Sequence, residues 1–481
     1  MKIQRTQSLE EGTLTAVFLT EQNQAATANG LPKGFPKPVA EHAEKDKITY
    51  HLTADGLGPQ AVFYGLGQDA ELETEDFRGA IHKAVSKANE RKAGQLQLVF
   101  LASEGLQHTE YLAIALGETP ELSNYQFKPY QKDAKPKPLE TVKVYTDLTN
   151  AEDLIAYGKR TAEGTNHARD LVNEPPNVIY PETLSQRARE LGEQTGFTVE
   201  VWDKAKIEEE GMGGLLAVNL GSELPPTFTI MTWKPDNATN SQPVVLVGKG
   251  VTFDTGGLSL KPSSSMVGMK GDMGGSAAVI GAMAGIAANN LPVHVVGLVA
   301  ATDNRPGKTA YTPNDVIKMY DGSHVEVNNT DAEGRMTLAD ALHYAKRLNP
   351  ALVIDLATLT GAAVIAVGSR ATAMMATAEE TTRKRLHEAG KHTFERLVEL
   401  PLWDDYGEQL KSDIADLKNV GGREAGSITA GKFLQHFTDY PWIHLDIAGP
   451  AYLDKGGSSY RPKHGTGVGV RLLTEFIRRY S

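Results

Sequence analysis

The sequence has 481 residues, of which 40% are hydrophobic and 23% are charged, and it contains no cysteine. This length allows two or three domains, and the composition is ordinary for a globular protein. The lack of cysteine excludes disulfides, thiolate catalysis and cysteine-bound zinc, and it is compatible with a reducing compartment. The formal net charge of −11 argues against bulk electrostatic attraction to nucleic acid.

The sequence shows neither a secretory signal at its start nor a run approaching the ~18 apolar residues of a membrane span. We therefore expect a cytoplasmic, enzyme-sized protein that makes no membrane contact.

Residues 1–150 are expected to form a smaller α/β domain that serves packing or assembly. Hydrophobic patterning predicts strands at residues 13–19 and 47–53, a helix at 75–90, and a buried strand at 95–102. Because no metal ligands or paired nucleophile and base gather in this region, we assign it no chemistry.

A lysine- and proline-rich segment, residues 128–138, is expected to be an exposed connection. A linker helix follows over residues 151–172. It is expected to start near Thr149, because Thr149 and Glu152 have the spacing of a capping box. The sequence Asn-Glu-Pro-Pro-Asn then ends the helix, since proline lacks the backbone amide. The remaining residues, 173–481, are expected to form the catalytic domain.

Apolar strands alternate with helices in the catalytic domain, which predicts a largely parallel sheet covered by helices on both faces. In such sheets, ligands bind beyond the carboxyl ends of the strands. The expected strands are 197–203, 227–233, 243–250, 293–301, 324–329, 351–359 and 442–449, and the expected helices are 181–194, 272–289, 333–347 and 378–397.

Two glycine-rich segments, Val247–Gly275 and Asn328–Arg335, each lie between an expected strand and an expected helix. Their residues include four carboxylates and three cations that we single out, namely Lys249, Asp254, Lys261, Asp272, Asp331, Glu333 and Arg335. Asp331 and Glu333 are two residues apart, so both would face the same side of an extended backbone. An ion-pair network would explain any one of these residues. The whole set favours a two-metal hydrolytic centre, because clustered carboxylates repel unless cations compensate them.

A third glycine-containing segment, Gly426–Lys432, matches the first seven positions of a phosphate-binding P-loop. Phe433 stands where a hydroxyl residue would bind magnesium, and no apolar strand precedes the segment. We therefore expect no nucleotide site there.

The sequences VGKGVTFDTGGLSLKP and NTDAEGR resemble those of the leucine aminopeptidase (cytosol aminopeptidase) family. The resemblance extends over residues 150–481, and Met336 stands where the family signature has leucine. It implies an α/β fold in which a smaller N-terminal α/β domain is joined by a long helix to the catalytic domain. It also implies a leucyl aminopeptidase, a metal-dependent exopeptidase that releases N-terminal leucine and other apolar residues by attack of a metal-bridging water or hydroxide.

The resemblance further implies residue roles. Lys249, Asp254, Asp272 and Glu333 would bind the more labile of two divalent metal ions, manganese or zinc, and Asp254, Asp331 and Glu333 the tighter one. Lys261 would polarise the scissile carbonyl, and Arg335 would hold a bicarbonate that acts as general base. The substrate-binding residues would be Lys261, Met269, Asn329, Thr358, Leu359 and Gly361.

The implied partners are peptides with a free N-terminus and five further copies of the chain in a homohexamer. Two alternatives remain: a narrow dipeptidase, such as one acting on cysteinylglycine, and a DNA-binding protein with a secondary peptidase centre, since some family members also bind DNA. The lysines at 128–137 favour the second alternative, whereas the acidic balance disfavours nucleic acid as a partner.

Overall fold

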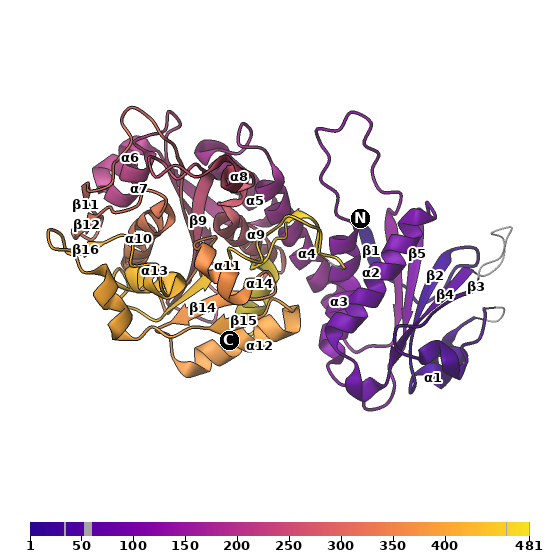
Figure 1. Ribbon diagram of the computed structural model, residues 1–481. Coiled ribbons are helices and arrows are strands. Elements are labelled where there is room, and N and C mark those ends of the chain that lie inside the picture. Colours follow the sequence, from indigo (N-terminus) through magenta and orange to yellow (C-terminus); the bar gives the residue numbers. More distant parts are fainter. Residues whose placement is uncertain (33–34, 52–59, 458, 481) are drawn as a thin grey trace. The chain divides into compact units, whose positions relative to one another are not determined.

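The computed structural model describes residues 1–32, 35–51, 60–457 and 459–480 (Figure 1). The chain divides into two compact units. The first comprises Met1–Glu163 with Gly457–Pro462, and the second comprises Gly164–Gly456 with Lys463–Ser481. Helix α4, Ala151–Asn173, begins in the first unit and ends in the second.

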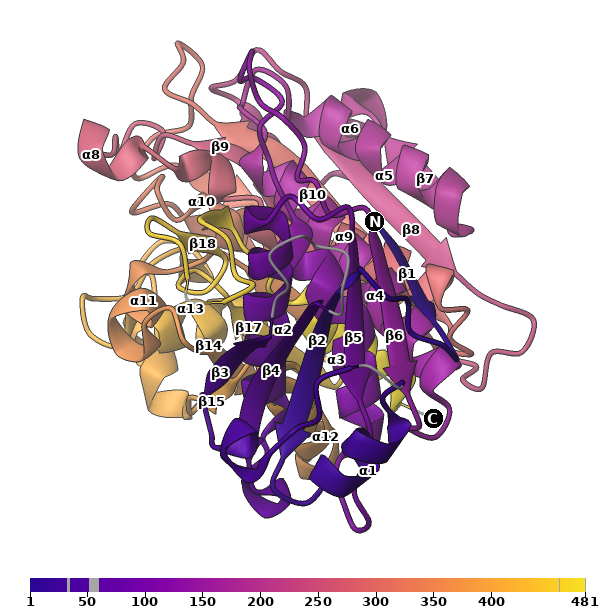
Figure 2. The same ribbon diagram turned by 90° about the vertical axis from the view of Figure 1, so that its right-hand side faces the viewer.

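The first unit is built on a six-stranded sheet with the order β1-β6-β5-β2-β4-β3 (Figure 2). All neighbours in this sheet are parallel except β3 and β4. Its elements are β1 Lys2–Arg5, β2 Leu14–Thr20, α1 Gln24–Gly30, η1 Ala40–Ala43, β3 Ile48–His51, β4 Gln60–Gly67, η2 Asp69–Glu71, α2 Thr74–Glu90, β5 Gln95–Phe100, α3 Thr109–Asn124 and β6 Thr141–Thr146.

Buried side chains on the two faces of this sheet form separate cores, which explains why β2 is buried along its whole length. The predicted helix at 75–90 corresponds to α2, whose Phe77 and Ile81 are fully buried against the sheet. The predicted strands at 13–19 and 95–102 correspond to β2 and β5. The strand expected at 47–53 corresponds to β3, and its last two residues lie outside the described part of the chain.

The second unit is built on an eight-stranded sheet with the order β15-β14-β17-β13-β9-β10-β8-β7. The central strands β17, β13, β9 and β10 are parallel, whereas the β14–β17, β10–β8 and β8–β7 pairs are antiparallel. The strands are β7 Thr198–Trp202, β8 Thr227–Trp233, β9 Val244–Asp254, β10 Val295–Asn304, β13 Leu352–Ala357, β14 Thr372–Ala376, β15 Leu397–Glu399 and β17 Trp442–Asp446.

Helices cover both faces of this sheet (Figure 1). The backbone of β9 shows the alternation: Gly248 faces Ser276 of α9, whereas Lys249 faces Gly334 of α10. The helices are α5 Pro181–Thr195, α6 Lys204–Glu210, α7 Gly213–Asn219, α8 Ser263–Met266, α9 Gly274–Ala288, α10 Glu333–Ala345, α11 Gly361–Val367, α12 Glu380–Thr393, α13 Gly426–Gln435 and α14 Val470–Arg478, with the 3-10 turns η3 Met269–Gly271, η4 Lys346–Leu348 and η5 Asp404–Leu410.

Two sequence predictions about element placement are wrong. The strand expected at 324–329 is β12, His324–Glu326, which pairs with β11, Val316–Lys318, and β16, Leu417–Lys418, in a separate three-stranded sheet. The helix expected over 151–172 corresponds to α4, Ala151–Asn173, but its predicted start near Thr149 is wrong, because Asn150 has a positive φ of 54° and cannot be a helical residue. Thr149 is therefore not its N-cap.

A two-stranded sheet of β18, Tyr452–Leu453, and β19, His464–Gly465, completes the elements. Across the described residues, no helix combines the length and the apolar character that crossing a membrane requires.

Candidate active site

A pocket of about 940 Å³ lies in the second unit, at the carboxyl ends of the parallel strands β9, β13 and β17. Every residue predicted to bind metal, act in catalysis or bind substrate lines this pocket. These residues are Lys249, Asp254, Lys261, Met269, Asp272, Asn329, Asp331, Glu333, Arg335, Thr358, Leu359 and Gly361. The structure therefore brings the whole predicted set to one edge of the sheet, as expected for an α/β protein.

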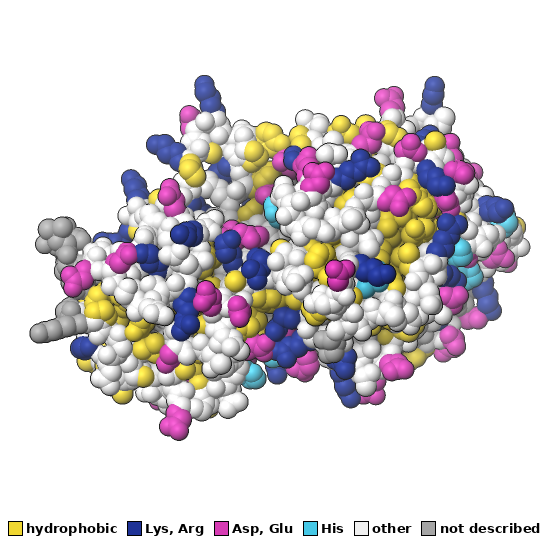
Figure 3. Space-filling view, turned by 180° about the vertical axis from the view of Figure 1, so that it is seen from behind, with side chains coloured by type: hydrophobic (Ala, Val, Ile, Leu, Met, Phe, Trp, Pro, Cys, Tyr) yellow, Lys and Arg dark blue, Asp and Glu magenta, His cyan; other side chains and the backbone are white. Residues whose placement is uncertain are grey.

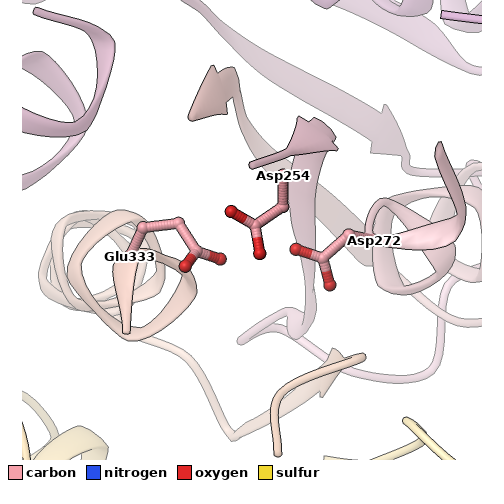
Figure 4. A group of neighbouring side chains, drawn as sticks. All are labelled: Asp254, Asp272 and Glu333. Atoms are coloured by element: carbon pink, nitrogen blue, oxygen red, sulfur yellow. The ribbon is translucent and has the colours of Figure 1, made fainter. Parts of the chain in front are cut away.

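Three buried carboxylates converge in this pocket (Figure 4). Asp254 is the last residue of β9, Asp272 precedes α9, and Glu333 is the first residue of α10. Each supplies one oxygen that lies within 4.8 Å of the oxygens from the other two. Their side chains are 8% exposed or less, so bulk water does little to offset the repulsion between them.

The backbone after β9 turns sharply, and its glycines allow this turn. Gly256 and Gly257 have φ values of 85° and 65°, a region in which a side chain is strained. The amide of Gly256 donates to Asp254 Oδ1 at 2.8 Å, which fixes the carboxylate at the end of the strand. Thr330 ties the two glycine-rich segments together, because its hydroxyl donates to Gly256 O at 2.6 Å and accepts from Ser259 N at 2.8 Å.

Two lysines bracket the carboxylates. Lys249 Nζ lies 2.7 Å from Asp272 Oδ2 and 2.9 Å from Glu333 Oε1. Lys261 Nζ lies 2.7 Å from Asp254 Oδ2 and also contacts Asp331. The pocket thus pairs each lysine with carboxylates from both glycine-rich segments.

Burial and charge shift the pKa values of these groups. Burial, reinforced by the charge of Glu333, raises the pKa of Asp254 to about 6. Burial likewise holds the pKa of Asp272 well above its usual range. Burial alone would lower the pKa of Lys249, but the carboxylates of Asp272 and Glu333 outweigh it and raise that pKa. The two lysines therefore do not fully offset the negative charge of the clustered carboxylates.

The residues present fit divalent cations. Glu333 Oε2 is buried and has no hydrogen-bond donor within the described part of the chain. Asp272 Oδ2 also lacks a hydrogen bond of good geometry there, although it lies in the ion pair with Lys249. Buried carboxylate oxygens are costly without a partner, and they are the ligands that hard cations prefer. The donor chemistry therefore supports a metal centre.

Arg335 is a buried cation without a carboxylate partner. It lies in the first turn of α10, and its Nη1 donates to Asn419 O at 2.8 Å. Within the described chain, its Nε has no hydrogen-bond acceptor and no carboxylate forms a salt bridge with it. Burial lowers the pKa of Arg335 to about 10. Such a guanidinium is suited to bind an anion that enters the pocket.

The predicted substrate-binding residues form another part of the wall. Thr358 follows β13, and its hydroxyl donates to Asp272 Oδ1 at 2.9 Å while its carbonyl accepts from Lys249 Nζ at 3.0 Å. Asn329 Oδ1 accepts from the amide of Asp331 at 2.9 Å. The wall near Leu359 is thus directly connected to the carboxylate cluster.

One sequence interpretation of local geometry changes in the structure. Asp331 and Glu333 do not share an extended backbone, because α10 begins at Glu333. A helix start there directs the Glu333 carboxylate toward Asp254 and Asp272 (Figure 4). The P-loop-like segment is helix α13, and its Lys432 pairs with Asp404 at 3.1 Å. Both glycines of this segment lie in a helix, whereas those of a P-loop lie in a phosphate-binding loop.

Sequence reasoning missed two buried polar residues beside the site. Asn304 ends β10, and its Nδ2 donates to Asp254 Oδ1 at 2.9 Å and to Thr330 O at 3.0 Å. Asp446 ends β17 and accepts from groups in the loop after β13. Both are polar residues at the carboxyl end of an apolar strand, and that position is the signal that could have found them.

Comparisons with known proteins point to one family. A family model described as the cytosol aminopeptidase family, catalytic domain, matches residues 166–474. A probable cytosol aminopeptidase of Geobacter sulfurreducens is 45% identical over 449 residues, covering 90% of this chain and 88% of the relative. Another, from Roseiflexus castenholzii, is 43% identical and covers 93% of this chain and 94% of the relative.

Among solved structures, the bottromycin maturation enzyme BotP in complex with Mn superimposes with a TM-score of 0.86. It is 34% identical in sequence, and the match covers 98% of this chain and 99% of that one.

Proposed function

The chain belongs to the cytosol aminopeptidase family and is a metal-dependent aminopeptidase; we propose that it prefers peptides with leucine or another apolar residue at a free N-terminus. The observation that carries this proposal is that the carboxylates of Asp254, Asp272 and Glu333 (the metal-type carboxylates) and the apolar wall lie side by side in one pocket. A substrate whose first side chain contacts that wall places its first peptide bond beside the carboxylates.

We propose that two divalent ions, manganese or zinc, bind in this pocket. Lys249, Asp254, Asp272 and Glu333 would hold one ion, and Asp254, Asp331 and Glu333 would hold the other. When bound, such a pair supplies Lewis acidity and activates water at neutral pH. Lys249 must lose its proton to act as a ligand, and neighbouring dications favour this by lowering its pKa.

The two remaining cations take separate roles in this proposal. Lys261 is 15% exposed at the pocket wall, so its ammonium can donate to the scissile carbonyl and stabilise the charge that develops on it. Arg335 would hold a bicarbonate, which would act as the general base on the attacking water. The guanidinium supports this assignment, because it has no salt-bridge partner among the described residues and a buried charge requires a counter-ion.

The proposed preference rests on the wall residues Met269, Leu359, Thr358, Asn329 and Gly361. The first two present apolar surface, and Gly361 has no heavy atom within 4 Å of where a Cβ would lie, which leaves room for a branched side chain. A free amino group would lie toward the carboxylates, so an N-acylated peptide should not bind productively.

The first test is hydrolysis of leucine p-nitroanilide by chelator-treated protein, with and without added manganese or zinc. We expect activity to return with metal and to be absent on the N-acetylated substrate. Inactivity on every free-amine substrate with every metal would refute the proposal. Turnover of cysteinylglycine alone would instead establish the narrow dipeptidase.

A DNA-binding function has weaker support. Residues 128–136 are exposed and include several lysines. On the face seen in Figure 3, however, the basic side chains are interspersed with acidic ones. A salt-dependent mobility shift with duplex DNA would favour this function.

We also propose a homohexamer in the cytoplasm. The absence of cysteine suits a reducing compartment. Light scattering should give six times the 51.9 kDa of one chain, and a monomeric mass would refute the assembly.

A further inference from the structure

Asp446 is a buried carboxylate behind the pocket wall rather than in it. It is 1% exposed and forms no salt bridge with a described residue. Its Oδ1 accepts from the amides of Leu359 at 3.2 Å, Thr360 at 3.4 Å and Ala448 at 3.2 Å. Its Oδ2 accepts from the hydroxyls of Thr360 at 2.6 Å and Ser427 at 3.5 Å. One side chain thus receives five donors.

These donors come from three separate segments, and each segment lines the pocket. Residues 359–362 follow β13 and begin α11, Gly426 begins α13, and residues 448–449 follow β17. They meet only in the tertiary structure, since Leu359 and Asp446 are separated by 87 positions in the chain. The carboxylate is therefore the common anchor of three parts of the wall.

We propose that Asp446 is a positioning residue that sets the shape of the wall contacting the N-terminal side chain, and so determines selectivity between substrates. This inference rests on the proposed function. Asp446 accepts hydrogen bonds from the wall beyond Thr358, whereas Asp254 accepts from the Gly256 amide and Asp272 accepts from the Thr358 hydroxyl. Loss of the Asp446 carboxylate should therefore change how well the N-terminal side chain of the substrate fits against the wall, without releasing bound metal.

The beginning of the loop after β13 explains why substrate fit and metal binding should be affected separately. Thr358 is held by Asp272 and Lys249, so the start of the loop stays with the metal-type cluster. Leu359 and Thr360 depend on Asp446. A defect at Asp446 should thus displace the part of the wall beyond Thr358.

A carboxylate is required because every partner of Asp446 is a donor. The Asp446→Asn variant keeps the shape but must direct an amide N–H₂ group toward N–H or O–H groups. If that group faces Thr360, the Thr360 hydroxyl must accept from it while also capping α11 through Ala363 N at 3.0 Å. At least one buried donor then loses its acceptor, which loosens the loop.

The test compares Asp446→Asn with wild-type protein on leucine and alanine p-nitroanilides. We expect the leucine-to-alanine ratio of kcat/KM to fall about tenfold or more, since misfit of a few methylene groups is worth that much. The loss should appear mainly as a higher KM for leucine, with bound metal per chain unchanged. An equal loss on both substrates, or a loss of metal, would overturn the proposal.

Hydrogen exchange of residues 358–364 provides a readout that does not depend on activity. Exchange in this segment should be faster in Asp446→Asn, and unchanged exchange would overturn the proposal even if the wild-type protein proved inactive on all substrates. Inactivity of the wild type together with faster exchange would refute the proposed function instead and leave Asp446 as the anchor of the wall.

Two further variants serve as a matched control and as a substitute for Asp446→Asn. Asp340→Asn is the matched control, because Asp340 is also fully buried, accepts from the amides of Leu215 and Tyr320, and does not line the pocket. It should leave the selectivity ratio and the exchange of 358–364 unchanged. If Asp446→Asn does not fold, Thr360→Val removes the shortest hydrogen bond to Asp446, together with the cap on Ala363 N, and should shift the ratio in the same direction.

Discussion

Replacing Gly334 tests whether close packing of α10 against Lys249 places that lysine in the pocket. Gly334 lies in the first turn of α10, and an added Cβ would lie 2.3 Å from Lys249 Cε and 2.7 Å from both Cδ and Nζ. The lysine cannot easily move aside, because its Nζ is held by Asp272, Glu333 and Thr358 O. Gly334→Ala should therefore displace a group proposed to bind metal.

Two opposing effects set the magnitude. Alanine favours the helix over glycine by about 0.5–1 kcal/mol. Overpacking a buried site costs about 1–3 kcal/mol. The free energy of unfolding should thus fall by no more than about 2.5 kcal/mol, the difference between these ranges. A misplacement of about 1 Å in a catalytic site costs on the order of a hundredfold in rate, so kcat/KM should fall far more than stability does.

The assay is hydrolysis of leucine p-nitroanilide with added metal, alongside urea unfolding and a metal titration. Gly79→Ala in α2 is the matched control, because no heavy atom lies within 4 Å of its added Cβ. This control should gain about 0.5–1 kcal/mol and keep full activity. If Gly334→Ala retained wild-type activity and metal affinity, close packing against α10 would not be what places Lys249.

Three further changes have distinct expected results. Asn304→Ala removes a donor to Asp254 and should raise the metal dissociation constant about 10- to 100-fold in a chelator competition, whereas unchanged affinity would contradict a supporting role. Burial raises the pKa of Asp340 to about 7, above its unfolded value, so the folded state gains protons and stability as pH falls from 7 toward 4. Thermal melting at several pH values should show this gain in wild-type protein and a smaller one in Asp340→Asn. An equal dependence of melting temperature on pH in the two proteins would refute the prediction. Asp355→Ala removes the partner that lies 2.6 Å from the buried His444 and should cost about 3–5 kcal/mol in urea unfolding, and a cost below 1 kcal/mol would show that the pair is not needed.

The sequence alone determined the fold class, most of the elements that carry the site, and the family. Alternating apolar strands and helices are local patterns, and β9, α9 and β13 were recognisable from them. The two glycine-rich segments were recognisable because carboxylates, lysines and glycines seldom gather in that order without a reason. The residues they contribute line one pocket.

Only the tertiary structure decided how distant segments meet. The small sheet that holds β12 was not predictable, since short strands carry no signal of which sheet they join. Asn304 and Asp446 end apolar strands, a position that marks them as candidates, but their contacts are with partners 50 and 87 positions away. Burial and strand register create those contacts, and both are properties of the folded chain rather than of any local run of residues.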